Sequence, residues 1–117
     1  MNQLQKLEPT VKLSIKNPKS ESASLFGRGI ADLCLGVRNL GSLNAAAKSM
    51  GMAYSKAWRI IKETEAALDI QLLNRDGAHG STLTPEGDTL LDTDLDIDKK
   101  MQVEAIKVYQ KILSKSK

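Results

Sequence analysis

Apolar residues recur along the chain with two periods, and each period predicts a different element. Residues 10–16 alternate strictly: Val11, Leu13 and Ile15 lie on one side and polar residues on the other. This period of two is typical of a half-buried strand. Residues 1–9 show little pattern, and we expect them to be frayed. The expected organisation is a frayed N-terminus 1–9, a folded domain 10–83 and a C-terminal helix 84–117.

Three short helices are predicted in the middle of the chain. Apolar positions recur at helical spacing over residues 28–40, 43–50 and from 53 or 54 to 68. Gly41 and Gly51 follow the first two helices as stop signals, because glycine tolerates the left-handed conformation that ends a helix. Ser42 is placed to cap the second helix. The inward stripe of the third helix is Ala57, Ile61, Thr64 and Leu68.

A hairpin and a long helix are predicted to follow. Residues 70–73 and 81–83 suit two short strands, and the residues between them have turn chemistry. Thr84 can cap the last helix, Pro85 suits its first turn and Glu86 complements its dipole. This helix is expected to reach about residue 113.

Four aspartates alternate with other residues in the last helix: Asp92, Asp94, Asp96 and Asp98. Aspartate is a weak helix former, so a kink or break at this run is left open. The run lacks the central glycine and the terminal glutamate of a calcium loop, and no metal is expected there.

Helix, helix, helix, strand, turn, strand is the element order of a winged helix-turn-helix domain. We therefore predict a mainly α fold with a small β wing and a long C-terminal dimerisation helix. Only four residues are aromatic, so aliphatic and alanine side chains are expected to fill the core.

The charge distribution indicates where a polyanion would bind. The net charge is +3, and residues 1–80 hold eleven basic and seven acidic residues. Between Lys48 and Lys62 there are four cations and no acid. A local basic face favours nucleic acid as the partner, although a solvated lysine-rich surface would look the same.

The helix-turn-helix pattern places the third helix where its N-terminal half can enter a major groove. Arg59 could bond a guanine edge, and Lys62 suits a phosphate. Trp58 could instead be a partly buried prop, and His79 a solvent-exposed loop residue. The predicted contacts to double-stranded DNA are Ser42, Asn44, Tyr54, Ser55, Lys56, Trp58, Arg59, Lys62, Arg75, His79 and Ser81.

The last helix carries an apolar stripe that a small domain cannot cover fully, and such stripes usually mark an interface. We predict a homodimer that presents two third helices to a palindromic site. The alternative is a helix that folds back onto its own domain. The predicted interface residues are Leu91, Leu95, Met101, Ile106, Tyr109 and Leu113.

Several classes of function are not expected. One cysteine and one histidine, far apart, form no nucleophile–base pair, disulfide or metal cluster, so no enzyme activity and no cofactor are predicted. Cys34 lies in an apolar stretch and is expected in the core. No signal peptide or membrane span is evident, which favours a cytoplasmic protein without a membrane partner. A protein-interaction module on a winged-helix scaffold is the alternative function.

Four motifs carry a family resemblance: Phe26-Gly27-Arg28-Gly29, Gly41-Ser42-Leu43-Asn44-Ala45-Ala46-Ala47, Met52-Ala53-Tyr54-Ser55-Lys56-Ala57-Trp58 and Leu83-Thr84-Pro85-Glu86-Gly87. The stretch 41–61 resembles the helix-turn-helix of LysR-type regulators. The fuller pattern, over about residues 10–95, resembles the N-terminal domain of the molybdate-responsive ModE regulators. The resemblance implies bacterial-type transcription regulation through DNA binding, and dimerisation through the last helix.

Two departures from the ModE pattern limit what this resemblance implies. The wing, Asp76-Gly77-Ala78-His79-Gly80, is shorter and less glycine-rich than is usual in that family. Molybdate is sensed in that family by additional C-terminal oxyanion-binding domains, to which nothing in residues 1–117 corresponds. Molybdate is therefore not expected as a ligand.

Overall fold

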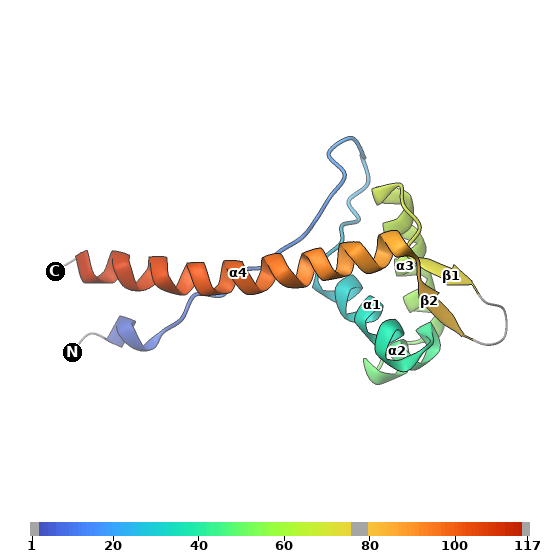
Figure 1. Ribbon diagram of the computed structural model, residues 1–117, viewed down its shortest axis with the longest axis horizontal. Helices are drawn as coiled ribbons and strands as arrows, with labels where there is room; N and C mark the ends of the chain where they lie inside the picture. Colours follow the sequence, from blue (N-terminus) through green and yellow to red (C-terminus); the bar gives the residue numbers. More distant parts are fainter. Residues whose placement is uncertain (1–2, 76–79, 116–117) are drawn as a thin grey trace.

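Three short helices, a two-stranded hairpin and one long protruding helix follow one another along the chain (Figure 1). The computed structural model describes residues 3–75 and 80–115. The molecule measures 61 × 33 × 22 Å, and its long axis follows the last helix. The elements are η1 (Gln3–Lys6), α1 (Arg28–Leu40), α2 (Leu43–Ser49), α3 (Tyr54–Leu68), β1 (Leu73–Arg75), β2 (Ser81–Leu83) and α4 (Pro85–Lys115).

The predicted helix ends are confirmed at most positions. Gly41 ends α1 in the left-handed conformation with φ of 86°, and Gly51 has φ of 67° in the turn between α2 and α3. The Ser42 hydroxyl caps α2 by accepting the backbone N–H of Ala45 at 3.0 Å. Helix α2 ends at Ser49, one residue earlier than the pattern predicts.

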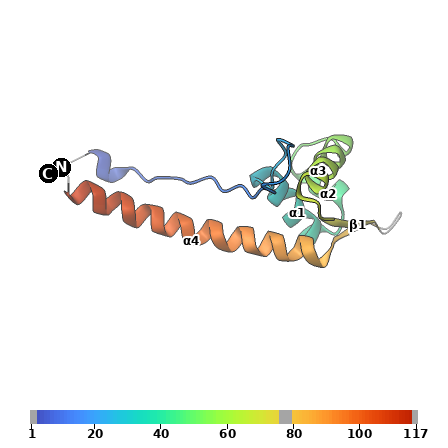
Figure 2. The ribbon, with the colours of Figure 1, turned by 90° about the horizontal axis from the view of Figure 1, so that it is seen from above.

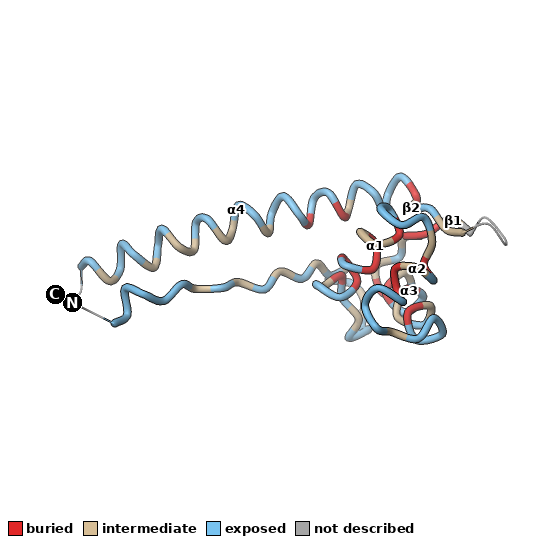
Figure 3. The backbone as a smooth tube through the Cα atoms, turned by 90° about the horizontal axis from the view of Figure 1, so that it is seen from below, coloured by how far each residue is buried: buried red, intermediate tan, exposed pale blue. Residues whose placement is uncertain are grey.

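The core lies between α1, α2, α3 and the first turns of α4 (Figure 3). Phe26 is its one fully buried aromatic side chain among the described residues, and aliphatic and alanine side chains fill the rest, as predicted. Helices α1 and α2 approach so closely that a Cβ atom on Gly36 would lie 2.6 Å from the Cβ of Ala46. Small residues therefore determine the spacing of the first two helices. Cys34 is fully buried, as expected.

The first strand of the wing hairpin is displaced from its predicted position, whereas the second lies at residues 81–83 as predicted. The strands pair antiparallel with Leu73 opposite Leu83 and Arg75 opposite Ser81, so pairing extends two residues into the predicted turn. Leu72 lies outside the ladder, and its N–H donates to the Glu65 carboxylate at 2.7 Å. Its carbonyl accepts the N–H of Thr84 at 2.9 Å, which fixes the start of α4.

The N-terminal segment differs from both predictions made for it. Within the stretch expected to be frayed, residues 3–6 form the 3-10 helix η1. Residues 10–16 form no strand; their backbone makes one isolated bridge, between Ile15 and Phe26. The predicted alternation is nevertheless present, since Val11 and Leu13 are half-buried and their neighbours exposed. The segment runs beside α4, and a helix offers no free backbone groups to form a ladder (Figure 2).

Helix α4 is continuous over 31 residues and passes through the aspartate run without a break. Ion pairs stabilise two aspartates of this run, Asp92 and Asp96, and a third aspartate nearer the start of the helix, Asp88. Arg38 of α1 binds Asp88 and Asp92, and Lys100 binds Asp96 one turn away at 3.0 Å. Although α4 is long, no helix in the described ranges is apolar enough along its length to cross a bilayer.

Candidate nucleic-acid interface

One face of α3 is buried and the opposite face is open to solvent. Ala57, Ile61 and Thr64 are buried in the core, as the period predicts. Tyr54 is 50% exposed, and the side chains of Arg59 and Lys62 are 63% and 51% exposed. Ser55 and Lys56 are exposed as well. The structure thus brings five of the predicted contact residues together on the outer side of α3.

Acids on the same helix partly balance the cations of this face. Arg59 Nη1 lies 3.9 Å from the Glu63 carboxylate, and Lys62 Nζ lies 3.4 Å from Glu65. The Arg59–Glu63 pair is exposed on both sides, and such pairs are weak, whereas the Glu65 side chain is only 11% exposed. Lys48 and Lys56 form no ion pair with any residue that the structure describes. The α3 face therefore offers exposed cations that a polyanion can recruit.

Trp58 lies between the buried and the exposed faces of α3. Its ring is partly buried and packs against the core, as a prop for α3 would. The ammonium of Lys62 lies 5.5 Å from the ring centroid, within the range of a cation–π contact. Trp58 therefore supports the position of a cation on the outer face, whatever else it contacts.

The turn between α1 and α2 contributes Ser42 and Asn44. The Ser42 oxygen is engaged in the helix cap, while its hydroxyl proton is left to donate. Asn44 is exposed at the start of α2. Both therefore lie at the N-terminal end of α2, where backbone N–H groups favour anions.

The base of the wing is joined to this same turn. The N–H of Ser81 donates to the carbonyl of Gly41 at 3.3 Å. Gly80 has φ of 113°, and a Cβ there would lie 2.6 Å from the same carbonyl oxygen. Ser81 is half-buried at the start of β2, and Arg75 ends β1. The predicted contact His79 lies outside the described residues.

Two further residues belong to this surface: Glu65, which was not singled out from the sequence, and Lys48, which was named only as a member of the basic stretch. The Glu65 carboxylate accepts the N–H groups of Leu72 at 2.7 Å and Leu73 at 3.2 Å, so it connects α3 to the wing. Lys48 is an exposed cation near the end of α2. The acid-free count between positions 48 and 62 included Lys48, whereas no local pattern indicates the role of Glu65.

Cys34 is fully buried, and its thiol is a poor nucleophile. Burial, and then the negative charge of Glu65, raise the pKa of the Cys34 thiol to about 12. A thiol with this pKa holds almost no thiolate at neutral pH, and the thiolate is the nucleophilic form. Cys34 therefore acts as a small apolar core residue.

The predicted dimer residues of α4 do not share one environment. Leu91 is fully buried in its own domain, so its assignment to an interface is wrong: the first turns of α4 complete the core. Tyr109 donates its hydroxyl to the carbonyl of Leu4 at 2.7 Å, which fastens the N-terminal segment to α4. Leu95 is exposed, and the other three are half-buried: Met101, Ile106 and Leu113.

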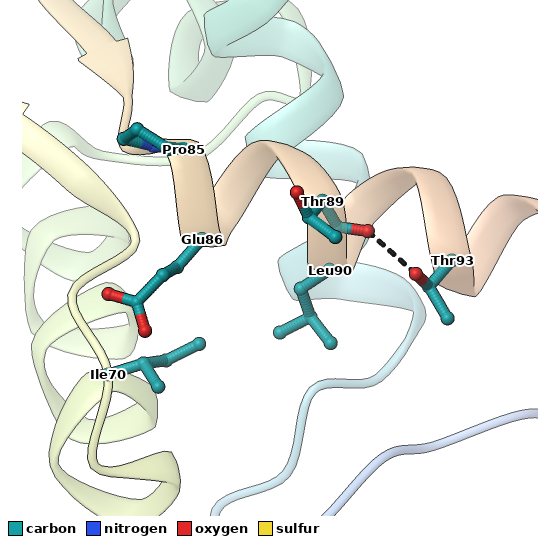
Figure 4. A pocket seen from close by; sticks show the side chains of 6 residues that line it. All are labelled: Ile70, Pro85, Glu86, Thr89, Leu90 and Thr93. Atoms are coloured by element: carbon teal, nitrogen blue, oxygen red, sulfur yellow. Dashed lines mark hydrogen bonds between the residues drawn. The ribbon is translucent and has the colours of Figure 1, made fainter.

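A shallow pocket of about 460 Å³ lies where α4 passes the loop after α3 (Figure 4). Ile70 and Leu90 form its apolar side, and Glu86 is its one charged residue. The hydroxyl of Thr93 is satisfied within α4 by the Thr89 carbonyl at 2.8 Å. This hollow presents no cation and adds nothing to a nucleic-acid surface.

The arrangement of α1, α2, α3 and the β1–β2 hairpin defines a winged helix-turn-helix domain, as predicted. Residues 32–88, just under half of the chain, match the model of a family described as "Bacterial regulatory helix-turn-helix protein, lysR family". Residues 32–88 are therefore similar to the LysR-type helix-turn-helix, which supports that part of the resemblance. The likeness to ModE stays a prediction. No curated protein matches the sequence significantly.

Two solved structures are similar in fold. The structure described as "Crystal structure of CbnR_DBD-DNA complex" matches with a TM-score of 0.58 at 23% identity, covering 70% of this chain and 93% of that one. The second is VV2_1132, a LysR family transcriptional regulator, with a TM-score of 0.53 at 24% identity. That match covers 63% of this chain, which corresponds to 25% of the length of that regulator.

Proposed function

We propose that this protein is a sequence-specific DNA-binding transcription regulator. In this proposal α3 enters the major groove and the wing lies on the adjacent backbone. The observation that carries it is the outer face of α3, where Arg59 and Lys62 are exposed while Ala57 and Ile61 are buried. The family match over residues 32–88 and the fold shared with a domain solved bound to DNA support the same conclusion.

The direct test is selection of bound sequences from a random pool of double-stranded DNA. A regulator of this kind enriches one motif, and a homodimer enriches a palindrome with half-sites about one helical turn, or a multiple of it, apart. Recovery of unrelated sequences, together with tight capture of a protein ligand, would favour an interaction module instead.

Arg59→Ala tests the role of α3 on the selected site. If Arg59 reads a base, the variant loses about 1–3 kcal/mol of binding free energy and accepts other bases at one position. Arg28→Ala is a matched control, because Arg28 is also an exposed arginine 3.9 Å from an acid four residues on, but lies at the start of α1. Equal affinity of the wild type and Arg59→Ala would remove Arg59 from the interface.

Salt dependence separates phosphate contacts from base contacts. Phosphate contacts release counterions, so affinity should fall steeply as salt is added. Lys56→Ala should weaken binding to all sequences alike and reduce the salt slope by about 1. An unchanged slope would mean that Lys56 touches no phosphate.

The proposed homodimer forms through the far end of α4 and the N-terminal segment. Leu4, Leu7, Val108 and Ile112 are exposed there, and we call these four the distal apolar surface. An apolar groove of about 450 Å³ lies in the same region, and its lining includes Pro9, Val11 and Val108. A groove beside exposed apolar side chains suits the side chains of a second copy.

The charges of α4 favour an antiparallel pairing. Residues 86–98 contain six acids and no cation, and residues 99–115 contain five lysines and one acid. Two such helices side by side place opposite charges together only when they run in opposite directions. A twofold axis of this kind presents the two α3 helices to one palindrome.

Light scattering of two variants tests the dimer. Ile112→Asp places a charge on the distal apolar surface and should reduce the mass from twice 12.8 kDa to the monomer value. Val103→Asp is the control: Val103 is 49% exposed and lies nine residues away, on the opposite side of a helix with about 3.6 residues per turn. A wild-type monomer at micromolar concentration would refute the dimer.

A further inference from the structure

A second, deeper pocket lies where the N-terminal segment, α1 and α4 meet. It holds about 590 Å³, within the range of sites that bind small molecules. Figure 2 shows how the N-terminal segment runs from α1 along α4, and these are the three elements that line the pocket. Its walls are largely apolar side chains: Val11, Leu13, Ala31, Leu35 and Leu95.

Asp94 lines this pocket and is 7% exposed. It forms no hydrogen bond and no ion pair with any residue in the described ranges. No buried side-chain oxygen among the described residues lacks a hydrogen-bond partner, so the oxygens of Asp94 still reach the solvent of the pocket. A carboxylate in so confined a position is poorly solvated, which is unfavourable for its charged form. Burial, and then the charges of Asp98 and Asp32, raise the pKa of Asp94, while the charge of Arg28 lowers it in part. The net effect disfavours the carboxylate, so an added positive charge beside it would be favourable.

The cations around the pocket supply only part of that charge. Arg28 pairs with Asp32, 3.9 Å away, and its charge acts on Asp94 without an ion pair between the two in the described ranges. Lys12 lines the pocket without forming an ion pair among the described residues. With Asp32 and Asp98 also on the lining, the balance of charge at this pocket is negative.

The surroundings of Asp94 favour an organic cation over a metal ion. No group of three or more histidine, cysteine or acidic side chains in the described part of the chain is arranged to hold a metal. Hard cations require six or more oxygen ligands, whereas the walls here are mostly hydrocarbon. A primary ammonium on an alkyl chain satisfies both features: the head neutralises the carboxylate and the chain replaces water on the apolar walls.

We propose that the pocket around Asp94 is a binding site for an alkylammonium ligand. The ligand would join the N-terminal segment, α1 and α4, and would thereby stiffen the connection between the helix-turn-helix and the long helix. If the protein is the regulator proposed above, such a ligand is an effector of DNA binding. The binding itself does not depend on that function.

The experiment titrates the full chain with hexylammonium chloride in the absence of DNA, followed by calorimetry and by amide NMR shifts. Hexan-1-ol is the neutral probe of the same length. We expect saturable binding of the amine, shifts centred on Ala31, Leu35 and Asp94, and no saturable binding of the alcohol. Asp94→Asn should weaken the amine by about 10- to 100-fold, as expected for loss of a charged partner.

Asp96→Asn is the matched control, because Asp96 lies in the same acidic run but is exposed and pairs with Lys100. It should bind the amine like the wild type. Unfolding curves accompany each variant; should Asp94→Asn fail to fold, Asp98→Asn on the pocket lining replaces it.

Three results would overturn the proposal. The first is that Asp94→Asn and the wild type bind the amine with equal affinity, and the second is that the wild type shows no saturable binding. The third is that Asp94→Asn changes the mass of the dimer while no amine binding is found. The last would assign the carboxylate to a second copy of the chain. A separate DNA titration without amine reports on the proposed function. The proposed function and the proposed amine site can therefore be refuted independently of each other.

Discussion

The guanidinium of Arg38 in α1 lies against the carboxylate of Asp88 at the start of α4, with Nε and Oδ1 3.0 Å apart. A second nitrogen, Nη1, lies 2.9 Å from Asp92 one turn later. The hydrogen bond to Asp88 is the largest cause that raises the pKa of Arg38, so the arginine remains charged at all relevant pH values. This contact connects the first helix of the domain to the helix that protrudes from it.

Replacing Arg38 by methionine should lower the free energy of unfolding by about 1 kcal/mol, the upper value for an exposed pair. Methionine keeps the apolar part of the side chain and removes both ion pairs. The loss should shrink in high salt, because salt screens exposed charges. Urea unfolding at two salt concentrations measures it. The control is Arg28→Met, whose long, exposed pair should contribute nothing measurable.

Because α1 and α2 approach closely, replacing Gly36 by alanine should have the opposite effect on stability from the usual one. Alanine normally stabilises a helix relative to glycine by about 1 kcal/mol. Gly36→Ala should instead destabilise the protein by about 1–2 kcal/mol, because the new Cβ would lie 2.6 Å from that of Ala46. Gly29→Ala, in the same helix with nothing within 4 Å, serves as the comparison and should not destabilise. Thermal unfolding of both variants and the wild type measures these changes in stability.

The raised pKa of Asp94 predicts that this carboxyl group destabilises the folded protein as the pH rises, which is the opposite of what a paired carboxylate does. Its pKa in the folded protein is raised above the ordinary value of 3.8, so folding disfavours the ionised form. The stability that depends on its protonation is present below pH 3.8 and is lost as pH rises through the raised pKa. Asp94→Asn should therefore be more stable than the wild type at neutral pH, by a margin that closes on acidification.

Thermal midpoints of Asp94→Asn, Asp96→Asn and the wild type between pH 4 and pH 7.5 test this dependence. Asp96 is exposed, so its replacement should show no such pH dependence. A margin for Asp94→Asn that widens as the pH falls would contradict the assigned direction.

Cys34 should resist thiol reagents in the folded protein. With a pKa of about 12 and no exposed surface, it presents neither thiolate nor access. Labelling with a disulfide reagent at pH 8 should be slow in buffer and fast in denaturing urea. Rapid labelling of the native protein would mean that the core opens locally far more readily than its packing implies.

The sequence predicted the helices well because their signals are local. The ends of α1, and the start and end of α3, follow from apolar spacing with Gly41, Ser42 and Gly51 at the boundaries. The outward direction of Arg59 and Lys62 follows equally from the buried period of Ala57 and Ile61. The positions of these candidate contacts on α3 were therefore predictable, whereas their contacts with DNA remain a proposal.

The wing and the N-terminal segment were predicted less well because their positions depend on distant partners. The carboxylate of Glu65 in α3 accepts the N–H groups of Leu72 and Leu73 where the hairpin begins. Nothing near Leu4 indicates that Tyr109, 105 residues away, binds its carbonyl. A period-two pattern identifies a half-buried extended segment and leaves open whether a strand or a helix lies beside it.

The amino-acid sequence by itself determined the element order of the winged helix-turn-helix and the basic outer side of α3, because both depend on the spacing of residues that are close together in the chain. Only the tertiary structure decided that Leu91 completes the core, that the N-terminal segment covers part of α4, and that Asp94 lines a pocket with 7% of its surface exposed. The physical reason is that burial depends on which surfaces meet, and segments remote in the chain supply those surfaces here.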